Sequence, residues 1–118
     1  MIGTCPEFSK DETELVIKAA WEAFKFFQTT TARERSRLLR KWHDLVIQNL
    51  EDISILITLE NGKPLTDARG EVAYAASFLE WFSEEAPRVY GNVMPVADSG
   101  NQVLTVREPV GVCALITP

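Results

Sequence analysis

The last hydrophobic run of the chain has no counterpart elsewhere in the sequence. Val110–Ile116 is apolar and interrupted only by Gly111, without a polar position to face water. Such a run predicts a parallel strand that is covered on both faces. A strand of this kind needs neighbouring strands and covering helices, which the other residues do not supply. We therefore expect the chain to be one piece of a larger α/β protein.

Helical patterns precede this run. Two capping boxes, each a Ser or Thr with Glu three residues later, predict the first two helix starts: Ser9 with Glu12, and Thr31 with Glu34. The first helix is expected over 10–27. Asn49 is predicted to cap a third helix, which ends at Gly62.

Each of these helices carries apolar residues at helical spacing, which predict a buried stripe. The stripes are Val16, Ala19, Ala20, Ala23, Phe24 and Phe27 on the first helix, Leu38, Trp42, Leu45 and Val46 on the second, and Ile53, Leu56 and Ile57 on the third.

A fourth helix is predicted over 66–86, and it is apolar around most of its circumference. One stripe contains Val72, Ala75, Ala76, Leu79 and Phe82, and a second contains Tyr74, Phe78 and Trp81. Three preceding helices could cover one of these faces but not both. Residues 92–96 and 103–106 then predict a two-stranded β-ribbon joined by a loop.

Composition and charge exclude several classes of protein. The 118 residues carry a formal net charge of -5, which argues against a nucleic-acid binder. No stretch is apolar and long enough to span a membrane, and the first residues do not have the pattern of a signal peptide. We therefore expect a soluble chain whose two distant cysteines are free thiols.

The residues that could carry chemistry all favour structural roles. Cys113 is expected to be buried within the strand and inert, and Cys5 has no nearby base. His43 is predicted to be a surface or half-buried side chain, and one His with two dispersed Cys cannot form a zinc site.

Charged clusters do not predict a site either. Adjacent Glu84 and Glu85 point in different directions on a helix and form no acid/base pair. A basic cluster spreads around its helix, which favours a solvated or subunit-facing surface over a phosphate site: Arg33, Arg35, Arg37, Arg40 and Lys41. No phosphate-binding or nucleophile motif is present.

Two longer motifs do resemble a known family. Residues 107–118 read REPVGVCALITP, and residues 59–91 read LENGKPLTDARGEVAYAASFLEWFSEEAPRVYG. These motifs resemble the N-terminal third of an aldehyde dehydrogenase, in particular of the succinate-semialdehyde dehydrogenase subgroup, and the resemblance extends over essentially the whole chain. It implies a truncated α/β fold of the aldehyde dehydrogenase type, with four α-helices followed by a β-ribbon and the first strand of the dinucleotide-binding sheet.

The resemblance also implies three parts. Residues 1–91 would be the N-terminal helical part of the cofactor-binding domain, and residues 92–109 a ribbon arm toward the oligomerisation domain. Residues 110–118 would be the truncated first strand of the dinucleotide-binding sheet. In the family the sequence Thr-Pro is followed by Trp and Asn, and this chain stops one residue before the Trp.

Site residues follow from the same resemblance. In open α/β sheets ligands bind beyond the carboxyl ends of strands, and the family residues that match Ile116, Thr117 and Pro118 run beside the nicotinamide end of NAD or NADP. Tyr74 matches a helix position that borders the aldehyde entrance in relatives, with a core aromatic as the alternative reading.

The family reaction uses a cysteine thiolate, a glutamate base and an asparagine oxyanion donor, none of which matches a residue here. We therefore expect no catalytic residue and no metal in this chain, and no activity from it alone. The full-length enzyme is expected to be a homotetramer or homodimer that oxidises a small aldehyde, binds neither nucleic acid nor membrane, and is cytoplasmic, with the mitochondrion left open.

A different class of function stays open beside the dehydrogenase. The chain could be a self-contained helical binding module whose fourth helix docks a partner. The coding sequence past Pro118 separates the two: Trp-Asn directly downstream favours the enzyme, and a stop codon favours the module.

Overall fold

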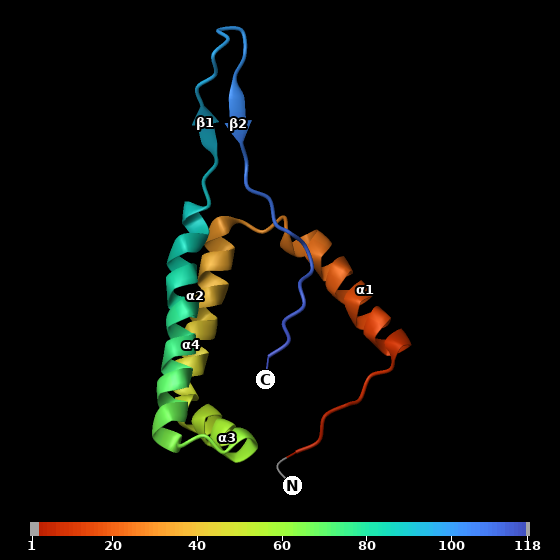
Figure 1. The fold of residues 1–118 in the computed structure, drawn as a ribbon, viewed down its shortest axis with the longest axis vertical. Coiled ribbons are helices and arrows are strands. Elements are labelled where there is room, and N and C mark those ends of the chain that lie inside the picture. The colour runs from red at the N-terminus through yellow and green to blue at the C-terminus, as the bar shows by residue number, and fades with distance from the viewer. Residues whose placement is uncertain (1–2, 118) are drawn as a thin grey trace. The chain divides into compact units, whose positions relative to one another are not determined.

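The computed structural model describes residues 3–117 and contains four α-helices followed by a short β-ribbon (Figure 1). In chain order the elements are α1 (Lys10–Phe27), α2 (Ala32–Gln48), α3 (Leu50–Asn61), α4 (Leu65–Glu85), the 3-10 turn η1 (Ala86–Arg88), β1 (Asn92–Met94) and β2 (Val103–Thr105). The chain divides into two compact units. The first unit holds α2, α3, α4 and η1, and the second holds α1, the ribbon and the segment after it.

Local capping determines where the first two helices begin, as the sequence predicts. Ser9 Oγ accepts the N–H of Glu12, while a Glu12 carboxylate oxygen accepts the N–H of Ser9 at 2.7 Å. Thr31 and Glu34 repeat this reciprocal pair at the start of α2. Each pair satisfies two backbone donors that a helix start would otherwise leave without partners.

Asn49 departs from its predicted role. It occupies the N-cap position of α3 but makes no side-chain cap there. Its side-chain amide instead donates to the Leu45 carbonyl at 2.8 Å, at the end of the preceding helix. Only one residue separates α2 from α3, so the same side chain can satisfy either end, and it satisfies the C-terminal carbonyl of α2. Gly62 ends α3 with φ 75°, in the left-handed conformation predicted for it.

The core of the first unit lies where α4 meets α2 and α3. Small side chains occupy this side of α4: Ala68, Val72, Ala76 and Ser83 are buried. Short side chains allow the helix axes to approach closely, so α4 packs against both neighbours. Ser54 is the buried residue that α3 contributes.

The stripes predicted for the earlier helices are only partly correct. On α2, Leu38, Trp42 and Leu45 are exposed, whereas Val46 is half-buried as predicted. The covered side also carries Leu39, Arg40 and His43. No residue of α1 is buried, because neither strand of its own unit packs along it. On α3, Leu56 is exposed whereas both isoleucines of the stripe are half-buried.

The ribbon forms where it was predicted. β1 and β2 pair antiparallel, with Asn92 opposite Thr105. Gly91, just before β1, has to be glycine, because an added Cβ would lie 1.9 Å from the Thr105 carbonyl oxygen.

The apolar run after the ribbon forms no strand in this structure. Residues 106–117 have no regular secondary structure, and Val110 and Ile116 are 92% and 96% exposed. The sheet found among the described residues is the two-stranded ribbon of β1 and β2, and the run joins neither of its free edges. The predicted burial of Cys113 is wrong for the same reason, because nothing in the described chain covers it and it is exposed.

Candidate functional site

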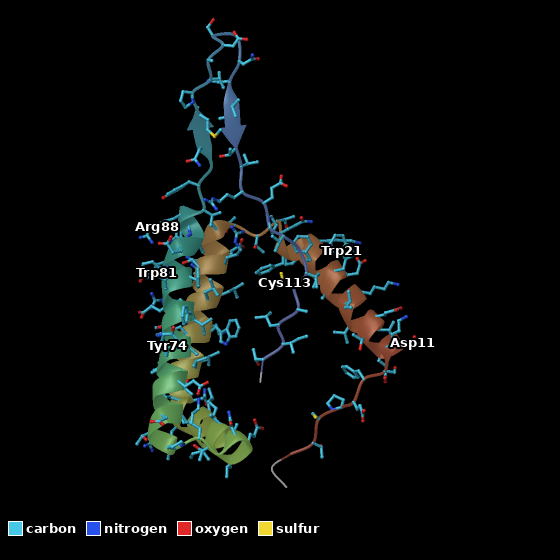
Figure 2. All side chains as sticks on the ribbon, viewed as in Figure 1. Asp11, Trp21, Tyr74, Trp81, Arg88 and Cys113 are labelled. Carbon is cyan, nitrogen blue, oxygen red and sulfur yellow. The ribbon has the colours of Figure 1, made fainter. Side chains whose placement is uncertain are left out.

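Tyr74, the predicted residue of the aldehyde entrance, stands in the middle of α4 with its side chain in solvent (Figure 2). The residue is 66% exposed. Its ring meets the ring of Phe78 edge to face, with centroids 4.9 Å apart. This geometry suits the opposite charges of a ring face and a ring edge, so the pair holds the phenol in a defined direction.

Tyr74 belongs to a larger apolar surface, the α4 aromatic face, which consists of Tyr74, Phe78, Trp81 and Phe82. All four side chains are exposed. They line an open groove of about 650 Å³ together with Ser77, Glu80 and Glu84. The sequence predicted that Phe82 belongs to the same buried stripe as Val72. In the structure Phe82 is 54% exposed and lies at the edge of that stripe, on the side that the other helices leave open.

The α4 aromatic face lies opposite the packed side of the helix. Tyr74 follows the buried Val72 by two residues, and at about 100° per residue the two side chains are turned by about 200° from each other. Trp81 likewise comes two residues after the half-buried Leu79, so its side chain also points away from the covered side of the helix. The helices of the first unit therefore cover one side of α4 and leave the other open, as the two stripes in the sequence predict.

The predicted cofactor residues lie at the end of the second unit. Ile116 and Thr117 are exposed and have no regular secondary structure, and Pro118 lies outside the described residues. No hydrogen bond found in the described chain uses the backbone of Ile116 or Thr117. Their N–H and C=O groups are therefore available for backbone contacts with a ligand.

The residues considered as nucleophiles or metal ligands form no cluster. Cys5 and Cys113 are free and exposed, and the Cys113 thiol approaches only its own backbone, at the Gly111 carbonyl. His43 is half-buried, as predicted, and its Nδ1 lies 2.9 Å from Asp44. Within residues 3–117, no three His, Cys, Asp or Glu side chains gather in a way that could hold a metal ion. None of the helices described there is long and apolar enough to cross a membrane.

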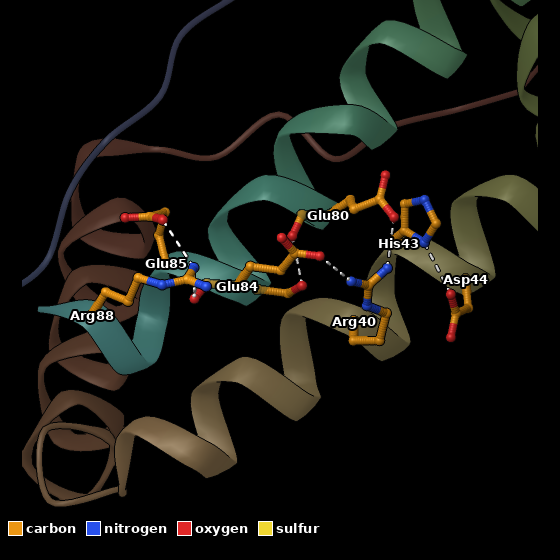
Figure 3. A network of polar contacts seen from close by, with 8 residues as sticks. Arg40, His43, Asp44, Glu80, Glu84, Glu85 and Arg88 are labelled. Carbon is orange, nitrogen blue, oxygen red and sulfur yellow. Dashed lines mark hydrogen bonds and ion pairs between the residues drawn. The ribbon is translucent and has the colours of Figure 1, made fainter.

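A polar network across α2 and α4 was not predicted from the sequence (Figure 3). Arg40 donates from Nη1 to Glu80 at 2.8 Å and from Nη2 to Glu84 at 3.1 Å. The hydrogen bond to Glu80 raises the pKa of Arg40 above its usual value, and both carboxylates add to this effect. The signal in the sequence was the spacing of the two acids, because residues four apart share one helix face.

This network accounts for one member of the basic cluster of α2, Arg40. Arg40 is paired with two carboxylates of the same chain, so it is not a free donor for a phosphate. Arg88 likewise bonds the Glu84 carbonyl and the Glu85 carboxylate. The carboxylates of Glu84 and Glu85 therefore have different arginine partners, Arg40 and Arg88.

Comparisons with known proteins relate the whole chain to one family. The family model described as "Aldehyde dehydrogenase family" matches residues 1–118. The chain is 47% identical over 118 residues to glutarate-semialdehyde dehydrogenase of Pseudomonas aeruginosa, covering all of this chain and 24% of that protein. It is also 47% identical over 118 residues to succinate-semialdehyde dehydrogenase [NADP(+)] of Saccharomyces cerevisiae, with the same two coverages.

Solved structures agree with these sequence matches. The crystal structure of succinate-semialdehyde dehydrogenase from Burkholderia pseudomallei matches with a TM-score of 0.89 and 48% identity, covering 94% of this chain and 23% of that one. The chain thus spans about a quarter of the length of the curated relatives it matches. The fold of this chain therefore resembles that of the matched part of that enzyme.

Proposed function

Given that this chain belongs to the aldehyde dehydrogenase family and is close to its succinate-semialdehyde dehydrogenases, we propose that it is the N-terminal part of an NAD(P)-dependent enzyme that oxidises a semialdehyde to its carboxylate. The observation that carries this proposal is the match over all 118 residues at 47% identity to enzymes named for succinate or glutarate semialdehyde. Both names describe an aldehyde with a carboxylate at the far end. Succinate semialdehyde is our first choice of substrate, because the resemblance read from the sequence motifs is to that subgroup.

We further propose that these residues do not turn over substrate by themselves. The family reaction needs a thiolate nucleophile with a base nearby, and within residues 3–117 no hydrogen bond is found between either cysteine and a basic side chain. Cys113 lies within reach of a backbone carbonyl only, which cannot activate a thiol. The chain would therefore supply scaffold and binding contacts, while the nucleophile, the base and the oxyanion donor would come from the rest of the enzyme.

Ile116, Thr117 and Pro118 are proposed to contact the nicotinamide end of NAD or NADP. The exposed, unbonded backbone of Ile116 and Thr117 fits a contact made through N–H and C=O groups. When bound, the cofactor supplies the acceptor for the hydride of the aldehyde. The name of the yeast relative includes NADP(+), but the choice between the two cofactors is left open for this chain.

Tyr74 is proposed to border the entrance through which the aldehyde reaches the cofactor. Its exposed ring is held by Phe78 and stands beside the groove of the α4 aromatic face. A rigid aromatic wall with one hydroxyl suits a short substrate that has both an apolar chain and polar ends.

A chimera tests the proposed activity. The segment of the yeast relative that matches this chain is replaced by these 118 residues, and the chimera is assayed for NADPH formation with succinate semialdehyde and with glutarate semialdehyde. We expect kcat/KM of the chimera for succinate semialdehyde to lie within about tenfold of that of the yeast enzyme. The gel-filtration volume of the chimera is a separate test, of the proposed homotetramer or homodimer. A folded chimera without aldehyde oxidation would overturn the proposed function.

The chain alone provides the complementary assay. Purified as 118 residues and mixed with NAD or NADP and succinate semialdehyde, it is expected to give no sustained reduction of the cofactor. Sustained reduction would show that the groups assigned to the rest of the enzyme are not essential.

A binding module without catalysis is the second candidate, and the uncovered α4 aromatic face is the observation that favours it. The two candidates differ in the coding sequence after Pro118. Trp-Asn directly downstream supports the enzyme, and a stop codon supports the module.

A further inference from the structure

We propose that Arg40 is a specificity-determining residue for the aldehyde, because it compensates carboxylates beside the entrance that would otherwise repel a negatively charged semialdehyde. The inference rests on the proposed function and on the position proposed for Tyr74. It adds to them a residue that favours substrates with a carboxylate. The role is electrostatic: Arg40 changes the charge that the substrate meets on its way in.

The composition of the groove beside Tyr74 is the first argument. It is lined by the aromatic side chains described above and by two partly exposed acids, Glu80 and Glu84. A semialdehyde that ends in a carboxylate also carries a negative charge at neutral pH. Two uncompensated carboxylates in the groove would therefore weaken the binding of such a substrate, whereas an uncharged aldehyde would be unaffected.

Arg40 lies where it cancels part of this charge. Its guanidinium comes from the neighbouring helix α2 and reaches both acids, with Nη1 2.8 Å from Glu80 and Nη2 3.1 Å from Glu84 (Figure 3). One positive charge thus compensates one of the two negative charges that line the groove.

The neighbouring acids have partners of their own. Glu85 accepts a hydrogen bond from Arg88 at 3.1 Å, and Asp44 lies 2.9 Å from Nδ1 of His43. Within residues 3–117, Arg40 is the cation that forms ion pairs with the carboxylates of the groove. Loss of the Arg40 charge would therefore leave both of these carboxylates without a counter-ion.

The exposure of the network determines the size of the effect. Between 39% and 55% of each of the three side chains is accessible to solvent, so water and salt screen their charges. At a separation of about 10 Å, one unit charge changes the affinity for an ion by about twofold at the dielectric constant of water and by roughly fifteenfold at the effective value near a protein surface. A change of several-fold in KM is therefore expected.

Steady-state kinetics of the yeast chimera at saturating NADP test the inference. The substrates are succinate semialdehyde and butanal, an uncharged aldehyde with the same number of carbon atoms. In Arg40→Met we expect KM for succinate semialdehyde to rise at least about threefold at low salt. The rise should shrink as salt is added. KM for butanal, and kcat for both substrates, should stay within about twofold, because the lost interaction acts on the carboxylate in the ground state and the transition state alike.

Further variants separate charge from structure. Arg40→Lys keeps the positive charge but not the forked hydrogen bonds, so KM for succinate semialdehyde should stay near that of the unmodified chimera. Glu80→Gln, with Arg40 in place, should lower this KM. Arg40→Met combined with Glu80→Gln and Glu84→Gln removes the acids together with the arginine and should restore a low KM. Arg33→Met is the matched control, since it removes an exposed positive charge of α2 that does not line the groove.

Equal rises in KM for both aldehydes in Arg40→Met would overturn the inference, because an ion pair that only joins α2 to α4 affects both substrates alike. An unchanged KM for succinate semialdehyde at low salt, or the same rise in Arg33→Met, would also overturn it. The salt dependence and the triple variant are measured with succinate semialdehyde alone, so they decide the matter without turnover of butanal. Each of these results in an active chimera leaves the proposed function in place, whereas a folded chimera that oxidises no aldehyde removes the function itself.

Discussion

Arg40 on α2 bridges to Glu80 on α4, with its Nη1 2.8 Å from a carboxylate oxygen of Glu80. The two residues are 40 positions apart in the sequence, and Glu84 accepts a second hydrogen bond from the same guanidinium. The guanidinium thus joins α2 to two successive turns of α4, beside the packed small side chains of that helix. The two acids and the aromatic residues are on the same helix, and the α4 aromatic face lies away from the buried side of that helix.

The first prediction concerns this bridge. Arg40→Met keeps the aliphatic contacts but removes both ion pairs, and we expect a small decrease in the melting temperature of the chain, measured by circular dichroism. The side chains are partly exposed, so the decrease should become smaller as salt is added. Lys10→Met, which breaks the exposed pair of Lys10 with Glu14 within α1, should leave the melting temperature unchanged.

The helix caps provide a second prediction. Thr31→Ala removes the hydroxyl that accepts the Glu34 N–H, and we expect it to lower the free energy of unfolding by about 1 kcal/mol. Asn49→Ala should cost clearly less, because Asn49 makes no side-chain cap on α3. Urea titrations of both variants, in buffer with a stabilising osmolyte, give the comparison. Equal losses would contradict this expectation, because they would show that the Asn49 side chain stabilises the chain as much as the Thr31 cap does.

These two helix starts also illustrate how far the sequence determines the fold. A capping box is local, because its two residues are only three positions apart in the sequence. Both capping boxes were predicted correctly. Asn49 was predicted incorrectly because its amide has two local partners to choose from, and the choice depends on the geometry of the α2–α3 junction.

Features that depend on distant residues were predicted less well. Contact with α4 decides which side of α2 is covered. Arg40 lies on that side of α2 and pairs with Glu80 and Glu84 of α4. The strand expected at Val110–Ile116 needs neighbours that the described chain does not provide, so its apolar pattern alone produces no strand. The same limit applies to Ile116 and Thr117, whose proposed role depends on a sheet edge beside them.

Packing between α2 and α4 gives the third prediction. Ala76 is 1% exposed, so Ala76→Leu has to push the two helices apart and should destabilise the chain by about 1–3 kcal/mol. The adjacent Ala75 is exposed on the same helix, and Ala75→Leu should change the free energy of unfolding by no more than about 0.5 kcal/mol. Similar losses for both variants in urea titrations would contradict the packing described for α4.

The fourth prediction concerns pH. Arg69 on α4 donates two hydrogen bonds to Glu51 on α3, at 2.8 and 2.6 Å, and these hydrogen bonds lower the pKa of Glu51 below its usual 4.5. A carboxylate with a lowered folded-state pKa stabilises the fold above pH 4.5, and this contribution is lost as the pH falls through the folded-state pKa.

The chain should therefore lose stability on acidification below pH 4.5, and Arg69→Met should lose less over the same interval because the Glu51 contribution is already absent. Melting temperatures between pH 3 and pH 7 measure this difference. Arg33→Met removes the same charge from an exposed position and serves as the control. An acid-induced loss in Arg69→Met as steep as in the unmodified chain would show that the pair does not couple stability to pH.

The last prediction tests the proposed role of Tyr74 in the chimera with the yeast relative. If its ring borders the aldehyde entrance, Tyr74→Ala should raise KM for succinate semialdehyde by about tenfold and leave kcat less affected, since the contact would be made in the ground state and the transition state alike. Tyr90→Ala, which changes the other and similarly exposed tyrosine, should leave KM unchanged. Tyr74→Phe separates ring from hydroxyl: a KM near that of the unmodified chimera assigns the contact to the ring. A core aromatic would behave differently, because Tyr74→Ala would then lower the melting temperature of the chimera while KM stayed constant, and that result would remove Tyr74 from the substrate path.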